Sequence, residues 1–368
     1  MNRTPTWVVD VVGADLDLPD GSCLDCFFGV MSRSLSLLTG VLAVAVLLSL
    51  GTYWLVQAPS DDADLDTSVA VAEAMGSDTT GFARADRVRD FVFPVDHGPH
   101  PGFKTEWWYF TGNLSTEDGR RFGYQWTLFR VALTPPDSGD VPPERSLAAA
   151  SVSADSGASA WATNQFYMGH FAVSDLARQR HYDFERFSRA GVGLAGAQAE
   201  PWRVWLETWS LESTGDAPFP ARVRAQQGDV AIDLTVDPAK PRVLQGDRGL
   251  SQKGPGSGNA SYYYTYPRLA TEGTVVVDGD TLSVSGLSWL DREWSTSALG
   301  PEQVGWDWFA LQLDDGRDLM YYQLRNRDGS PSRFSEGVLV APDGAKTTLA
   351  RSDVRLEVVD RWTTPDGS

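Results

Sequence analysis

Short apolar and aromatic runs alternate with polar residues along the chain beyond about residue 90, which is the period of β-strands. No stretch of twelve residues there carries the apolar stripe of an amphipathic helix. The runs are separated by Asp-Gly dipeptides, which favour tight hairpin turns, at residues 118–119, 278–279, 315–316, 328–329 and 343–344. An all-β region of about 280 residues with so many hairpin turns is typical of barrels or sandwiches.

The segment from Leu37 to Val56 is apolar and uncharged, and it is long enough to cross a membrane as a helix. We interpret it as an uncleaved signal-anchor, with a long signal peptide as the alternative, because residues 56–58 have the small-residue form of a cleavage site but Pro59 follows them. Arg33 before the segment and four aspartates at residues 61–66 after it place the folded body outside the cytoplasm. We expect a cell-envelope protein, anchored in the inner membrane or secreted to the periplasm.

The residues on both sides of the apolar segment are acidic. The chain can be divided into five parts from these features. The extension before the apolar segment is acidic where a basic region is expected, so Met31 is an alternative start that would exclude Cys23 and Cys26 from the protein. Gly254–Gly258 is expected to be the flexible junction between two domains. The predicted parts are a cytoplasmic or wrongly included extension (1–35), the membrane or signal segment (36–57), an acidic linker (58–89), and two folded domains (90–253 and 254–368).

Two parts of the chain resemble each other as hairpins, at residues 106–130 and 305–327. Two hairpins of the same design predict a duplicated domain, and convergence of two aromatic hairpins is the alternative. The matched positions are Trp107 with Trp306, Phe110 with Phe309, Leu114 with Leu313, residues 118–120 with 315–317, Tyr124 with Tyr321, and Arg130 with Arg327.

The turn of the first hairpin leaves two registers open. A two-residue turn places Trp107 opposite Arg130 as a cation–π pair, whereas a loop one residue longer places Glu106 opposite Arg130 as an ion pair. In both registers we interpret Glu106 and Arg130 as satisfied groups that plug one end of a barrel, with a direct role in chemistry as the alternative.

Composition narrows the classes of function. The chain carries 31 Lys and Arg against 49 Asp and Glu, a net charge of -18, with no basic run, and this excludes nucleic acid as a partner. Cys23 and Cys26 both precede the apolar segment, so the body has no cysteine for catalysis, disulfides or metal binding. The chain has 14 Trp, about three times ordinary usage, and only Trp7 and Trp54 precede the body. The body is therefore expected to have an aromatic-lined interior.

Six blocks in order carry a family resemblance: FPVDHGPHPGFKTEWWYFTGNL (93–114), FGYQWTLFR (122–130), NQFYMGHFAVSD (164–175), VWLETWSL (204–211), SYYYTYPRL (261–269) and WLDREW (289–294). Together they resemble the CrtC/AttH-like proteins, a group that includes carotenoid 1,2-hydratases (hydroxyneurosporene synthases) and exported proteins labelled "predicted secreted hydrolase". The resemblance implies two lipocalin-like antiparallel β-barrel domains. Relatives usually continue past a segment like residues 361–365, so it also implies a second barrel without its closing strands or an incomplete reading frame.

For the hydratases, the resemblance implies an Asp proton donor assisted by a His, a Trp and a Tyr. We expect Asp291, between Trp289 and Trp294, to be this acid, and a structural carboxylate paired with Arg292 or with a backbone N–H is the alternative. The match is partial, because Trp289 stands where the Tyr is expected, and the block that holds Tyr262 and Tyr264 lacks the His and Trp.

Other residues complete the expected site. His170 and Glu106 are further catalytic candidates, with a satisfied interior histidine as the alternative for His170. His97 and His100 with Glu106 are a weak zinc inventory in a Gly/Pro-rich loop, so we expect no metal and no cofactor. No Gly-x-Ser-x-Gly elbow occurs, which disfavours a serine hydrolase. The expected ligand-binding side chains are the aromatic ones near these positions: Trp107, Trp108, Tyr262, Tyr264, Trp289 and Trp294.

Two functions fit these residues. The first is a hydro-lyase that protonates a C=C bond of an isoprenoid or lipid-like molecule and adds water, with Asp291 as the acid and aromatic faces around the cation. The second is a non-catalytic lipocalin-like carrier or chaperone of a hydrophobic ligand near the membrane. The sequence leaves open whether the protein is an enzyme.

Overall fold

The computed structural model describes residues 79–136, 163–297 and 299–360. Nearly all regular structure there is antiparallel β-sheet, so the prediction of an all-β chain is confirmed. The strands are β1 (Thr105–Ser115), β2 (Arg121–Ala132), β3 (Gln165–Asp175), β4 (Arg180–Arg189), β5 (Ala195–Gln198), β6 (Arg203–Leu206), β7 (Trp209–Ser213), β8 (Ala221–Gln227), β9 (Val230–Pro238), β10 (Val243–Leu244), β11 (Leu250–Gln252), β12 (Ala260–Val277), β13 (Asp280–Ser295), β14 (Gln303–Gln312), β15 (Asp318–Asn326), β16 (Glu336–Val340) and β17 (Lys346–Ala350).

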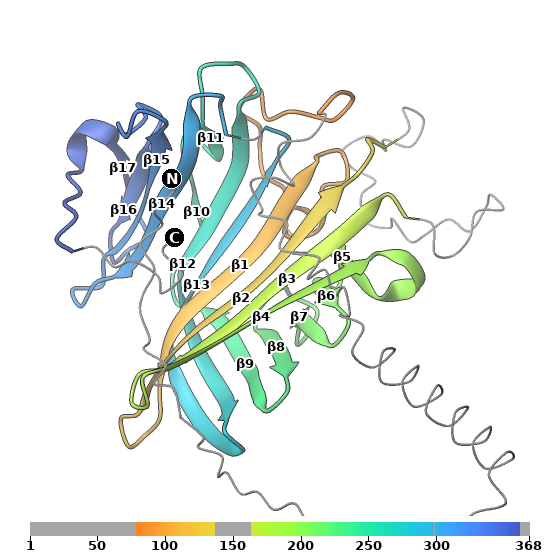
Figure 1. Ribbon diagram of the computed structural model, residues 1–368, viewed down its shortest axis with the longest axis vertical. Helices are drawn as coiled ribbons and strands as arrows, with labels where there is room; N and C mark the ends of the chain where they lie inside the picture. Colours follow the sequence, from red (N-terminus) through yellow and green to blue (C-terminus); the bar gives the residue numbers. More distant parts are fainter. Residues whose placement is uncertain (1–78, 137–162, 298, 361–368) are drawn as a thin grey trace, which may run out of the picture. The chain divides into compact units, whose positions relative to one another are not determined.

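The first sheet is one nearly closed barrel. Its eleven main strands follow the order β4-β3-β2-β1-β13-β12-β9-β8-β7-β6-β5, and β10 and β11 add to β12. The long strands from β4 to β12 run side by side in Figure 1. The alternation along the strands fits a sheet with one face turned inward, since in β1 and β9 every second side chain is buried in the shared interior.

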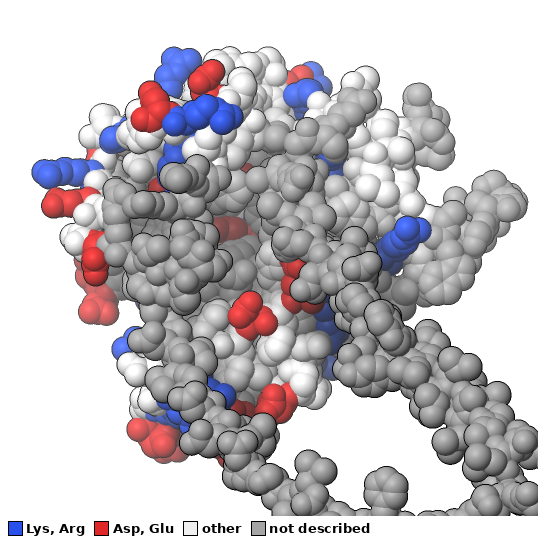
Figure 2. All heavy atoms as spheres, in the orientation of Figure 1, with Lys and Arg blue, Asp and Glu red and all other residues white. Residues whose placement is uncertain are grey.

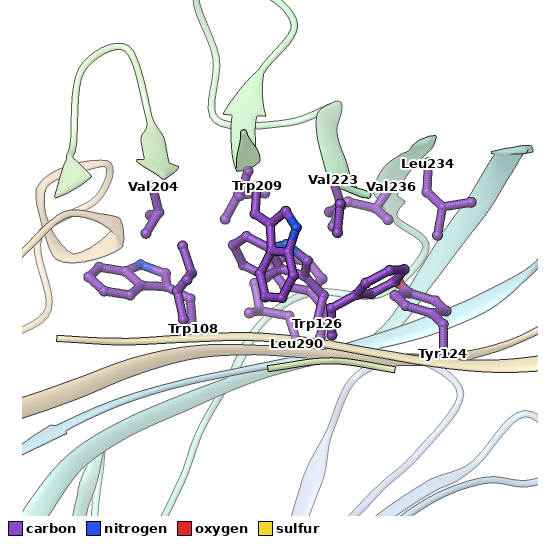
Figure 3. Close-up of a cluster of buried hydrophobic side chains, with 14 of the residues drawn as sticks. Trp108, Tyr124, Trp126, Val204, Trp209, Val223, Leu234, Val236 and Leu290 are labelled. Carbon is purple, nitrogen blue, oxygen red and sulfur yellow. The ribbon is translucent and has the colours of Figure 1, made fainter. Parts of the chain in front are cut away.

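The barrel interior is filled by side chains rather than left open around its centre. Figure 3 shows mainly aromatic residues of one wall pointing toward aliphatic residues and Trp209 of the opposite wall. The labelled residues are Trp108 (β1), Tyr124 and Trp126 (β2), Leu290 (β13), Val204 (β6), Trp209 (β7), Val223 (β8), and Leu234 and Val236 (β9). Five of the 14 tryptophans belong to this core, and all five are almost fully buried: Trp108, Trp126, Trp202, Trp209 and Trp294.

The second sheet has four strands among the described residues, in the order β14-β15-β16-β17. The expectation of two barrels was therefore wrong, because this open sheet does not curve back on itself. It buries its apolar face against the outer face of the first sheet, in a cluster that joins Tyr263 and Trp289 to Met320 and Tyr322. Residues 260–295, beyond the expected domain junction, form β12 and β13 in the middle of the first sheet.

Both predicted hairpins are present. In the first, Glu106 lies opposite Arg130, which confirms the register of the longer loop. The two turns have the same hydrogen bonds: Gly119 donates to Thr116 at 3.0 Å, and Gly316 donates to Leu313 at 3.1 Å. Both glycines have φ above +80°, a conformation that favours glycine. The shared turn supports one hairpin design, although the two hairpins belong to sheets of different size.

No helix in the part of the chain that the structure describes is long and apolar enough to span a membrane. The apolar segment at residues 36–57, the acidic linker and both cysteines lie outside the described residues. The predicted anchor and localisation therefore stay predictions. Figure 2 shows Lys and Arg side chains intermixed with Asp and Glu on the face that it displays. The exclusion of nucleic acid likewise stays a prediction from composition.

Candidate functional site

The predicted acid and four of the six predicted aromatic residues lie on opposite faces of the first sheet. Along β13, Leu290 and Trp294 point into the barrel interior, whereas Trp289 packs in the layer between the two sheets. Asp291 lies on the same side as Trp289, because side chains alternate along a strand. Arg292 therefore points into the barrel, away from Asp291, and does not pair with it.

Asp291 is a buried carboxyl group whose hydrogen-bond partners are uncharged. Thr265 Oγ1 and Trp289 Nε1 donate hydrogen bonds to its Oδ1 atom at 2.6 and 2.9 Å. Burial raises the pKa of Asp291 to about 7, although hydrogen bonds from Thr265, Trp289 and Tyr263 oppose the rise. The carboxyl group can therefore hold a proton near neutral pH, which an acid that protonates carbon requires.

Aromatic rings surround this carboxyl group. Tyr109 of β1 is the register neighbour of Asp291, and its ring lies 5.2 Å from that of Trp308 on β14. The ring of Trp308 in turn lies 6.4 Å from that of Trp289, edge to face. Burial raises the pKa of Tyr109 to about 12, so its hydroxyl stays protonated. Tyr109 and Trp308 are half-buried, and they form the accessible side of the layer.

A second carboxylate lies two residues along the same face. Glu293 accepts a hydrogen bond from Ser261 and lies 3.5 Å from Lys253 Nζ. The ammonium of Lys253 also lies 3.7 Å from the ring centre of Tyr322, on the second sheet. The charge of Glu293 adds to the rise in the pKa of Asp291. The layer therefore places Asp291, whose pKa is raised, two residues from Glu293, which is paired with Lys253.

Glu106 lies in the barrel interior, on the other face of the sheet. It is fully buried and forms ion pairs with Arg130 and Arg292. The backbone N–H of His100 also donates to it, at 3.0 Å. Burial alone would raise the pKa of Glu106, but the two guanidinium groups hold it well below the usual range. Glu106 thus forms a buried ion pair with Arg130, as expected for a satisfied structural pair.

The two histidines of the Gly/Pro-rich loop are also part of this interior. His100 contacts Asp96 through Nε2 at 3.0 Å and Arg292 through Nδ1 at 3.0 Å, and its ring stacks on Trp294 at 3.7 Å. Both of its ring nitrogens are therefore engaged. His97 Nδ1 lies 2.6 Å from the hydroxyl of Tyr264, and burial lowers the pKa of His97 to about 3, so the ring is neutral.

The three predicted catalytic residues do not come together. His170 points outward from β3 and pairs with Glu185 at 2.9 Å, with both side chains about one-third exposed. His170 and Asp291 lie in one row across the sheet, in which each residue faces the next on the neighbouring strand, and β1 and β2 lie between them. Because neighbouring strands are about 4.8 Å apart, the backbones of the two residues are about 14 Å apart. Glu106 lies on the opposite face from Asp291.

The six predicted ligand-binding residues also do not form one group. Trp289 contacts Asp291, and Trp107 lies half-buried beside Phe129. The other four, Trp108, Tyr262, Tyr264 and Trp294, belong to the barrel core.

Sequence reasoning missed four neighbours of Asp291, of which only some had a visible signal. Residues two apart share a face of a strand, so Tyr263 and Thr265 could have been inferred from strand pairing with residues 289–293. Tyr109 and Trp308 depend on contacts across strands and between sheets, and no spacing in the sequence indicates them. The neighbours are Tyr109, Tyr263, Thr265 and Trp308.

Comparisons with known proteins place the chain in a family. No curated protein matches it. It is similar to the crystal structure of a protein provisionally assigned as AttH from Nitrosomonas europaea, with a TM-score of 0.66 and 31% identity, covering 77% of this chain and 80% of that one. The crystal structure of kievitone hydratase from Nectria haematococca is similar with a TM-score of 0.49 and 14% identity, covering 73% of each chain. A similarity this low says nothing about activity. The AttH-like family model matches residues 84–368, and the chain therefore belongs to the AttH-like family.

Proposed function

We propose that this protein is a hydratase that adds water to a C=C bond of an isoprenoid or lipid-like molecule. The observation that carries the proposal is Asp291, a buried carboxyl group whose pKa is raised to about 7 inside an aromatic layer. Such a group keeps its proton near neutral pH, so it can remain buried beside an alkene and still have a proton to donate.

The reaction balances with this one acid. The π electrons of the alkene take the proton of Asp291, which forms a C–H bond and leaves a carbocation on the neighbouring carbon. The faces of Trp289, Trp308 and Tyr109 stabilise the cation by cation–π attraction. Water adds to the cation, and the proton that it releases returns to the Asp291 carboxylate. No cofactor takes part in this reaction.

The nature of the substrate follows from the surroundings of the acid. The layer around Asp291 is built mainly of Tyr and Trp rings and aliphatic side chains, so it favours an apolar molecule. The half-buried rings of Tyr109 and Trp308 offer the side on which a chain-like alkene can approach. We further propose that the protein works at the cell envelope, from the apolar segment at residues 37–56.

The test is hydration of a carotenoid or squalene-like alkene in water labelled with oxygen-18, followed by mass spectrometry. Wild type should give the labelled alcohol, and Asp291→Asn should lower the rate at least about 100-fold while Trp fluorescence still reports alkene binding. Asp237→Asn, an exposed change on β9, is the matched control and should keep the wild-type rate. Hydration that survives in Asp291→Asn would refute the role of this acid. Binding without hydration by wild type would favour the carrier function instead.

A further inference from the structure

A separate open pocket lies on the barrel side of β12. Its volume is about 1020 Å³, in the range of cavities that bind small molecules. Phe91, Phe93, Leu244 and Tyr266 supply its apolar walls. Tyr266 belongs to the barrel core, whereas its neighbour Thr265 donates to Asp291 on the opposite face of the strand. The pocket is therefore distinct from the layer that holds Asp291.

Two cations line this pocket, but only one of them is free for a ligand. Lys240 is buried, and its ammonium lies 2.6 Å from Asp318 Oδ2 and also donates to the carbonyl of Ala341 at 3.1 Å. Among the described residues, no carboxylate forms an ion pair with Arg242. Asp90 also lines the pocket, at its exposed edge. Arg242 thus brings a positive charge to a pocket that has both polar and apolar walls.

The position of Arg242 is set by aromatic side chains. Its guanidinium carbon lies 3.7 Å from the ring centre of Phe93, so the planar group rests on the pocket wall. Tyr266 is the hydrogen-bonding neighbour of Arg242, and burial raises the pKa of the Tyr266 hydroxyl, which therefore remains a donor. A guanidinium fork and a phenolic O–H together provide converging donors for an oxyanion.

We propose that this pocket binds a single-chain amphiphile with an anionic head, a carboxylate or a phosphate monoester. The head pairs with Arg242 and Tyr266, and the alkyl chain lies along Phe91, Phe93 and Leu244. This inference goes beyond the proposed hydratase activity, because it concerns another site and a saturated ligand.

The test is titration calorimetry of the full-length protein with four C12 probes below their micelle concentrations. Dodecanoate and dodecyl phosphate separate the two kinds of head group, and dodecanol and dodecyltrimethylammonium control for the alkyl chain. At least one anion should bind about tenfold or more tightly than dodecanol, because a charge-assisted hydrogen bond contributes that much. Equal affinities for the anions and dodecanol would overturn the proposal.

Variants separate the charge from the cavity. Arg242→Gln should weaken anion binding about tenfold and leave dodecanol unchanged, whereas Arg242→Lys should retain part of the affinity. Tyr266→Phe should weaken anion binding severalfold. Arg248→Gln changes an exposed arginine of the same region, paired with Asp247, and should have no effect. Anion binding unaffected by Arg242→Gln would contradict the proposal. Asp291→Asn should bind dodecanoate normally, so a failure of the hydratase proposal would not affect this result.

Discussion

Two buried carboxyl groups on neighbouring strands have opposite pKa shifts because their side chains lie on opposite faces of the sheet. Glu106 points into the barrel, where Arg130 and Arg292 keep it charged. Asp291 points into the layer between the sheets, where hydroxyl and indole donors replace arginines and burial raises its pKa to about 7. Such opposed environments are how a protein gives carboxyl groups different roles. This contrast makes Asp291 rather than Glu106 the candidate acid.

The raised pKa of Asp291 predicts a pH-dependent stability difference between wild type and Asp291→Asn. Well below pH 3.8, Asp291 is protonated in both the folded and unfolded states, so its ionisation does not affect stability. From the ordinary value of 3.8 to about 7, the unfolded chain releases the proton while the folded one keeps it, so wild-type stability falls as pH rises.

Urea unfolding of both proteins at pH 4, 5.5, 7 and 8 should therefore show Asp291→Asn gaining relative stability up to about pH 7, by on the order of 4 kcal/mol, and no further gain above it. A difference that is independent of pH would show that the pKa of Asp291 is not raised. Asp237→Asn should stay parallel to wild type across the series.

At the scale of elements, β1 and β13 approach each other closely at a glycine. Gly286 of β13 lies opposite Leu114, and a Cβ atom there would lie 2.0 Å from the backbone oxygen of Asn113. Gly123 on β2 lacks this constraint, since an added Cβ would meet nothing nearer than Ser174 Cβ at 3.8 Å. Only the first glycine is required by the pairing of strands.

Gly286→Ala should therefore destabilise the barrel by about 2 kcal/mol or more, because backbone atoms must shift to admit the methyl group. Gly123→Ala should change the free energy of unfolding by no more than about 0.5 kcal/mol. Urea unfolding of the two variants and wild type measures both values. Equal stability of the two alanine variants would show that the close approach at Gly286 is not maintained in solution.

At the scale of the whole molecule, a buried ion cluster fastens the second sheet to the first. The carboxylate of Asp318, at the start of β15, lies 2.6 Å from Lys240 Nζ and 2.8 Å from Arg268 Nη2. Lys240 follows β9 and Arg268 lies in β12, so both cations belong to the first sheet and its connections. Arg268 also donates to the carbonyl of Leu313 at 3.2 Å. The cluster adds polar contacts to the apolar layer that contains Trp289 and thus helps to hold β14 over Asp291.

Asp318→Asn should loosen the second sheet selectively, because it leaves two cations in a buried site, a change that costs about 3 to 5 kcal/mol. Hydrogen exchange followed by mass spectrometry should show faster exchange in β14 to β17 and unchanged exchange in β1 and β2. Asp315→Asn, in the exposed turn of the same hairpin and paired with Arg317, is the control and should exchange like wild type. Equal acceleration in both sheets would contradict a local fastening role.

The sequence by itself determined the strand class, the hairpins, the family resemblance and the acid candidate. These depend on local signals: apolar alternation, the Asp-Gly turns and the block around Asp291. For the first hairpin, the sequence narrowed the register of the two strands to two possibilities. The structure has the one that places Glu106 opposite Arg130 as an ion pair.

Only the tertiary structure decided which faces the candidate residues occupy and how large the second sheet is. The order of strands brings β13 between β1 and β12, and that pairing joins residues about 180 positions apart. Sheet closure depends on such distant pairings and not on local periodicity. For the same reason Trp308 and Tyr109 meet near Asp291, while His170 and Glu106 lie elsewhere: a side chain's neighbours are set by the strands on either side of it and by the sheet packed above it.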